Sequence, residues 1–175
     1  MRESMKPVLF QRDTGLFNRL MPTATTILCV FATVIPIHLP GFAVVTPAFV
    51  LVAVYHWSIY RPDLLPFVAT FAAGLLLDLL NGAPLGISSL VLLLSRALVV
   101  GQRGLFVGHG FTVVWAGFVG LAAAAVVFEW MIVSVFYGLV LDPRPFLFQA
   151  VLTVSAFPVV SYFLVRAQRG LLMRA

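Results

Sequence analysis

The chain has 175 residues, of which 62% are hydrophobic and 10% are charged, and its mean hydropathy is +1.08. Soluble domains carry about 25% charged residues, so this composition excludes a soluble globular protein and requires a lipid bilayer. The net charge of +5 does not indicate a nucleic-acid partner, because most cations lie in short loops and near the chain ends, where they set membrane orientation.

The hydropathy pattern predicts an all-α, polytopic membrane protein with about six transmembrane helices. Residues 1–22 are basic and form either an interfacial helix against anionic membrane lipids or a solvated cytosolic tail. Residues 23–166 form the transmembrane domain, and residues 167–175 form a second basic, cytosolic tail. The expected spans are approximately 23–39, 42–60, 64–80, 86–100, 111–141 and 146–165. Tyr55, Trp57 and Tyr60 are expected to form an aromatic belt where the second span leaves the membrane.

The distribution of cations predicts the orientation of these spans. With six spans, both ends of the chain lie on one side of the membrane. If that side is the cytoplasm, only Arg144 lies outside, and nine cations lie inside: Arg2, Lys6, Arg12, Arg19, Arg61, Arg103, Arg166, Arg169 and Arg174. Lys and Arg favour cytoplasmic loops, so the sequence predicts two cytoplasmic termini.

The most informative stretch is GLLLDLLNGAPLGISSLVLLLS, residues 74–95, in which two apolar helices flank a short break. Asn81-Gly82 favours a tight turn, and Pro84 cannot donate to a helix ladder. Asp78 lies one turn before the break. A carboxylate inside a membrane helix costs about 2.5–3.5 kcal/mol, so we expect Asp78 to point into the protein. Two roles remain open: it caps the turn by accepting backbone hydrogen bonds, or it contacts a partner helix.

Two further charged residues lie within the predicted spans. Arg96 is nearer the inner end of the fourth span, and we expect its side chain to extend to the inner lipid headgroups. Glu129 lies at an outer depth comparable to that of Asp78. We expect Glu129 in a water-lined crevice or at the outer interface.

Small residues follow one another at helical spacing in the fifth span. Gly117, Gly120 and Ala124 would allow close approach of a second helix, either within the protein or from a partner.

The sequence contains no pattern typical of catalysis, cofactor binding or metal binding. His38, His56 and His109 lie in separate segments without the spacing of metal ligands, and no phosphate-binding loop or nucleophile elbow is present. We therefore expect a protein that is not an enzyme.

The pattern Gly74, Asp78, Gly82, Pro84 and Gly86, followed by an apolar helix, resembles the bacterial rod shape-determining membrane protein family MreD. The resemblance implies a non-enzymatic scaffold of the cell-elongation complex in the inner membrane. Members partner MreC and through it join MreB filaments to the RodA glycosyltransferase and its penicillin-binding transpeptidase. The resemblance also implies a fold similar to the substrate-binding subunits of energy-coupling-factor vitamin transporters. Such a transporter subunit is the alternative function, and it would need a polar cavity for its ligand.

Overall fold

The computed structural model describes residues 12–34, 46–108 and 110–172, and this part of the chain forms helices joined by turns. Short 3-10 turns at Pro62–Leu64 and Arg103–Leu105 follow the second and fourth helices. The α-helices are α1 (Arg12–Val34), α2 (Phe49–Tyr60), α3 (Phe67–Asn81), α4 (Ile87–Gln102), α5 (Phe111–Tyr137) and α6 (Arg144–Leu172). The all-helical fold class is confirmed for the described residues.

The helices differ in their ability to cross a membrane. Within the described ranges, three segments are long and apolar enough to do so: Ile87–Leu105, Phe111–Tyr137 and Arg144–Arg166. The apolar segments Leu20–Val34, Phe49–Tyr60 and Phe67–Asn81 are shorter. At about 1.5 Å per residue, α2 reaches roughly 18 Å, whereas the hydrocarbon core of a bilayer is about 30 Å thick. The six expected helices are present, but α2 and α3 are shorter than independent spans.

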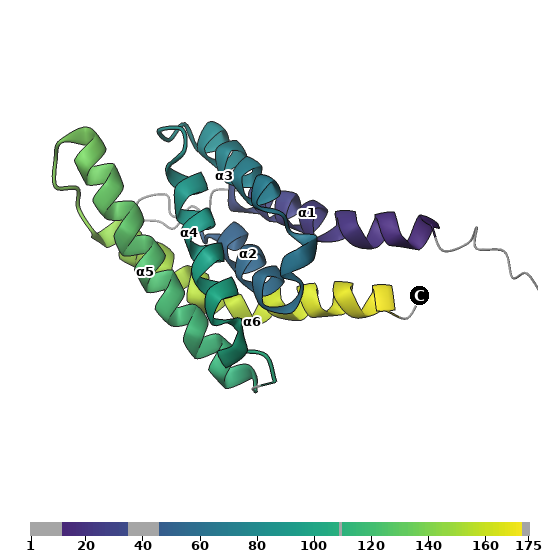
Figure 1. Ribbon diagram of the computed structural model, residues 1–175. Coiled ribbons are helices and arrows are strands. Elements are labelled where there is room, and N and C mark those ends of the chain that lie inside the picture. Colours follow the sequence, from purple (N-terminus) through teal and green to yellow (C-terminus); the bar gives the residue numbers. More distant parts are fainter. Residues whose placement is uncertain (1–11, 35–45, 109, 173–175) are drawn as a thin grey trace, which may run out of the picture.

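Helix α2 lies in the middle of the bundle, and every residue from Val50 to Ile59 is buried (Figure 1). A helix that is apolar on all sides is a core helix. The Tyr55 hydroxyl donates to the Val114 carbonyl at 2.8 Å, and the Trp57 indole donates to the Thr25 hydroxyl at 3.0 Å. The predicted aromatic belt is therefore wrong for Tyr55 and Trp57, because neighbouring helices enclose α2.

Aromatic rings connect α2 to the two longest helices. Phe118 of α5 stacks on Phe157 of α6 with ring centroids 4.4 Å apart, and Tyr55 lies 5.2 Å from Phe118. All three side chains are almost completely buried. This cluster fixes α5 and α6 against the central helix, while much of their remaining apolar surface is exposed.

Helix α1 is longer than the predicted first span. It begins at Arg12 and continues through Pro22 to Val34. The predicted span beginning at Thr23 is thus the C-terminal part of a helix that includes half of the expected N-terminal segment. Arg2, Lys6, His38, His109 and the tail beyond Leu172 lie outside the described residues.

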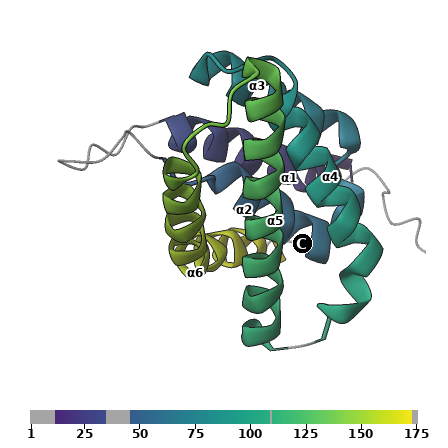
Figure 2. The same ribbon diagram turned by 90° about the vertical axis from the view of Figure 1, so that its left-hand side faces the viewer.

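The two ends of the described bundle lie on the same side. The start of α1 and the end of α6 are close in Figure 1, and the turn between α3 and α4 lies at the opposite end. Figure 2 shows α5 at the surface, with α4 on one side and α6 on the other. This arrangement leaves α5 available for contacts outside the chain.

Candidate functional site

The candidate site begins with the α3–α4 hairpin, which we define as α3, α4 and the turn 82–86 between them. Gly82 ends α3 with φ +65°, and Gly86 precedes α4 with φ +100°. Positive φ is readily adopted by glycine and is unfavourable for most other residues. The Ala83 amide donates to the Asp78 carbonyl at 3.0 Å, and the Ile87 amide donates to the Pro84 carbonyl at 3.5 Å. The two glycines thus allow a tight turn in which backbone amides of residues 83 and 87 bind backbone carbonyls of residues 78 and 84.

The carboxylate of Asp78 fastens the beginning of α4 to the end of α3. One oxygen accepts the Gly86 N–H at 2.7 Å, and the other accepts the Ser88 N–H at 3.1 Å. These amides belong to the unpaired donors at a helix N-terminus, where a negative charge is also favoured by the helix dipole. Asp78 is completely buried. The geometry favours the capping role over the alternative of a partner contact.

One turn below Asp78, the backbones of α3 and α4 approach closely. A Cβ atom placed on Gly74 would lie only 2.6 Å from the Ser89 backbone nitrogen. The Ser89 hydroxyl donates to the Phe71 carbonyl at 3.1 Å. Gly74 thus permits a contact that a side chain would prevent, and the hydroxyl of Ser89 fastens it.

Arg96 does not extend to the lipid headgroups, so that expectation is wrong. Its side chain is 5% exposed, and its Nη2 donates to the carbonyls of Pro62 at 3.0 Å and Leu65 at 2.6 Å. The guanidinium carbon also lies 3.9 Å from the centre of the Phe67 ring. The turn between α2 and α3 offers unpaired carbonyls close to α4, so the guanidinium binds inside the bundle and connects three helices.

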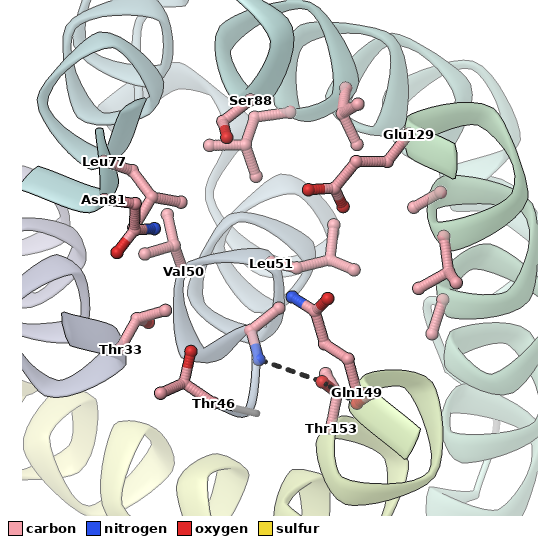
Figure 3. A pocket seen from close by; sticks show the side chains of 16 residues that line it. Thr33, Thr46, Val50, Leu51, Leu77, Asn81, Ser88, Glu129, Gln149 and Thr153 are labelled. Atoms are coloured by element: carbon pink, nitrogen blue, oxygen red, sulfur yellow. Dashed lines mark hydrogen bonds between the residues drawn. The ribbon is translucent and has the colours of Figure 1, made fainter. Parts of the chain in front are cut away.

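Glu129 lines a polar cavity of about 70 Å³ between the ends of several helices. Figure 3 shows its carboxylate pointing into this space, together with side chains from α1, α3, α4 and α6. This agrees with the expectation of a crevice at the depth of the hairpin turn. The polar lining residues are Thr33, Thr46, Asn81, Ser88, Glu129, Gln149 and Thr153.

The predicted row of small residues on α5 divides into two parts. Gly117 is half-buried, and a Cβ atom there would lie 2.9 Å from the Tyr55 hydroxyl oxygen and would overlap the Phe106 ring. Gly120 and Ala124 are exposed, and nothing lies within 4 Å of a Cβ placed on Gly120. Packing inside the chain is thus found at Gly117 and not at Gly120, because α4 and α5 diverge there.

Exposed Gly120 and Ala124 border open space between α4 and α5. An almost entirely apolar groove of about 560 Å³, which we call the α4–α5 groove, lies between Leu94 and Leu98 on one side and Ala124 and Met131 on the other. A smaller hollow of about 270 Å³ reaches from Ala124 to Gly120 and Phe106. These two spaces form a lateral opening in the bundle.

Several residues of the site were not identified from the sequence. Gln149 and Thr153 are four residues apart and face the cavity from α6, a helical spacing that could have indicated a polar face. Ser88 lines the cavity, and Ser89 binds the Phe71 carbonyl. Their backbone contacts could not be inferred, because they depend on the geometry of the turn. Among the described residues, no group of three or more His, Cys, Asp or Glu side chains lies close enough together to hold a metal ion.

Comparison with protein families gives a match over most of the chain. No curated protein and no solved structure matches the chain at a significant level. The family model described as rod shape-determining protein MreD matches residues 15–167, which include all six helices in whole or in large part. The chain therefore belongs to the MreD family of rod shape-determining membrane proteins.

Proposed function

We propose that this protein is a non-enzymatic membrane scaffold of the bacterial cell-elongation complex. In this role it binds MreC and helps to couple MreB filaments to peptidoglycan synthesis by RodA and its penicillin-binding transpeptidase. Membership of the MreD family supports a role in rod shape and placement in the membrane. The observation that carries the proposal of a scaffold is the lateral opening between α4 and α5.

The α4–α5 groove has the chemistry that a partner's membrane helix requires. Its surface is apolar, and the small side chains of Ala123, Ala124 and Ala125 lie along it. Helices associate in lipid through close packing, and small residues allow backbones to approach. Gly120 and Ala124 extend the same surface by one turn. We assign this opening to the single membrane span of MreC.

In the proposed orientation, the protein lies in the inner membrane and both of its termini lie in the cytoplasm. The nine cations on the cytoplasmic side and the single Arg144 on the other support this orientation. The shared side of the two chain ends in Figure 1 is consistent with it. The α3–α4 turn then faces outward.

The alternative function, a substrate-binding subunit of a vitamin transporter, is less well supported. Small-molecule sites usually have volumes of about 300–1,000 Å³. The polar cavity has a volume of about 70 Å³, which suits water or a small ion and not a vitamin. The predicted similarity to the fold of such subunits stays a prediction.

Substitution of Gly120 by Leu tests the proposed docking surface. The hollow of about 270 Å³ has room for the new side chain, and nothing lies within 4 Å of a Cβ atom placed at this position. We expect wild-type abundance and thermal stability, at least a tenfold loss of MreC in co-purification, and rounded cells.

Ala116→Leu is the matched control for this experiment. Ala116 is exposed on the same helix one turn earlier, and it is not among the residues lining the groove or the hollow. It should retain MreC and rod shape. Normal MreC recovery with Gly120→Leu, at normal abundance, would exclude docking over the part of the lateral opening that Gly120 lines.

A further inference from the structure

The polar cavity contains one ionisable side chain without a counter-charge. Among the described residues that line it, only Glu129 ionises, and no described residue donates a hydrogen bond to its carboxylate. Glu129 is half-buried, and a carboxylate that faces a cavity in an apolar bundle is costly unless it is paired or hydrogen-bonded. Asp78 is also an acid, and its two oxygens accept the Gly86 and Ser88 amides, so it brings no positive charge to Glu129. The cavity is thus lined by uncompensated negative charge.

Four hydroxyl side chains line the cavity, and two of them, Thr33 and Thr153, already donate their hydrogens to backbone carbonyls. Thr33 uses its hydroxyl hydrogen to donate to the Cys29 carbonyl at 2.8 Å. Thr153 donates to the Gln149 carbonyl at 2.6 Å and accepts the Ala48 N–H at 2.9 Å. A hydroxyl whose hydrogen is already committed can only accept at its remaining lone pair. These threonines therefore cannot serve as donors to the Glu129 carboxylate.

The side-chain amides of Asn81 and Gln149 each add a carbonyl oxygen and an NH2 group to the lining. Figure 3 shows both near the cavity, with the Gln149 amide on the same side as the Glu129 carboxylate. Carboxylate, carbonyl and hydroxyl oxygens are the ligands that hard cations prefer, and a single carboxylate balances one positive charge. A cavity of about 70 Å³ has room for one small ion together with water.

We propose that this cavity binds a small monovalent cation, of which sodium is the best fit, with Glu129 as its charged ligand. The lining residues come from α1, α2, α3, α4, α5 and α6 and from Thr46 and Ala48 before α2. One bound cation would therefore connect all these segments at the end of the bundle that carries the hairpin turn. The proposal is independent of partner binding at the α4–α5 groove.

The test compares the thermal stability of the purified full chain in sodium chloride and in N-methyl-D-glucamine chloride at equal ionic strength. A ligand that binds only the folded state raises Tm. At a ligand concentration of ten times the Kd, the rise in Tm is on the order of 3 °C. We expect sodium to raise the Tm of the wild type, and Glu129→Gln to abolish that dependence. Asp142→Asn removes an exposed acid from the α5–α6 loop and should leave the sodium effect unchanged.

Three results would overturn the proposal. Equal Tm values in the two salts would show that water alone fills the cavity. A Tm that depends on pH but not on sodium would show that Glu129 is neutralised by a proton. A sodium effect that survives Glu129→Gln would place the ion elsewhere. If Glu129→Gln does not fold, the binding of radioactive sodium to the wild-type protein tests the proposal instead. Saturable binding that unlabelled sodium displaces would support the site, and the absence of such binding would refute it.

Discussion

At the scale of the residue, buried polar side chains in this protein bind backbone groups of other segments. Asp78 binds two amides at the start of α4, and Arg96 binds two carbonyls in the turn before α3. In a membrane interior, each backbone group that lacks a partner costs several kcal/mol. Both side chains therefore stabilise irregular backbone that the bilayer would otherwise disfavour.

Asp78→Asn should be measurably destabilising, because an amide offers one acceptor oxygen where the carboxylate offers two. One of the Gly86 and Ser88 N–H groups would lose its partner, at a cost of about 1–3 kcal/mol. Asp78→Leu removes both acceptors and should lower Tm and membrane abundance further. Asp63→Asn, at an exposed position, is the control and should leave both quantities unchanged.

The same pair of variants separates the cap from a partner contact. If Asp78→Asn retains wild-type Tm and abundance but loses MreC in co-purification, the carboxylate acts on the partner and not on the turn.

Arg96→Lys should also reduce stability although it conserves the charge. A lysine ammonium lacks the plane that stacks on Phe67, and its nitrogen is not held at the position from which Nη2 donates to both the Pro62 and Leu65 carbonyls. We expect a loss of about 1.5–3 kcal/mol, the range for one hydrogen bond to a charged group. The Tm of Arg96→Lys is compared with that of Arg103→Lys, the control, because Arg103 is exposed. Equal Tm values for the two variants would mean that Arg96 contributes no specific contact.

At the scale of the element, the close approach of α3 and α4 depends on one glycine. Gly74→Ala introduces a methyl group against the Ser89 backbone, which cannot move without separating the helices. We expect reduced Tm and reduced membrane abundance.

Gly120→Ala is the matched control for this glycine, because the same substitution meets open space there. Alanine is favoured over glycine in a helix interior by about 1 kcal/mol, so this variant should be neutral or slightly stabilised. Equal behaviour of the two variants would show that the hairpin tolerates a wider separation than the structure has.

The elements themselves could be predicted much more fully than their contacts. Long apolar runs and the Asn81–Gly86 break indicate helix positions directly, and the cost of a buried charge indicates that Asp78 points inward. The partners of Arg96 could not be predicted, since helical periodicity does not show which loop packs against α4. The sequence left two alternatives open at Gly120 for the same reason: a row of small residues permits close packing but does not say whether a helix of this chain or of a partner supplies the contact.

At the scale of the whole molecule, the six spans expected from the sequence and the cation distribution together predict both termini in the cytoplasm. Reporter fusions that function only in the cytoplasm should be active at either end. A reporter inserted in the α5–α6 loop beside Arg144 should be inactive, which provides the control. An exported C-terminus would contradict the six-helix topology and the assignment of the hairpin turn to the outer side.

The central position of α2 has a consequence for the biogenesis of the protein. The N–H of Ala48, just before α2, is bound by Thr153 of α6, which is synthesised 105 residues later. At about 5–20 residues per second, translation leaves α2 without this partner for roughly 5–20 s. A helix of 12 residues is too short to cross the bilayer alone during that interval. It therefore has to stay in contact with the insertion machinery until α6 is made. Chains truncated before α6 should accordingly be recognised and degraded by membrane proteases, even though five of the six helices are complete.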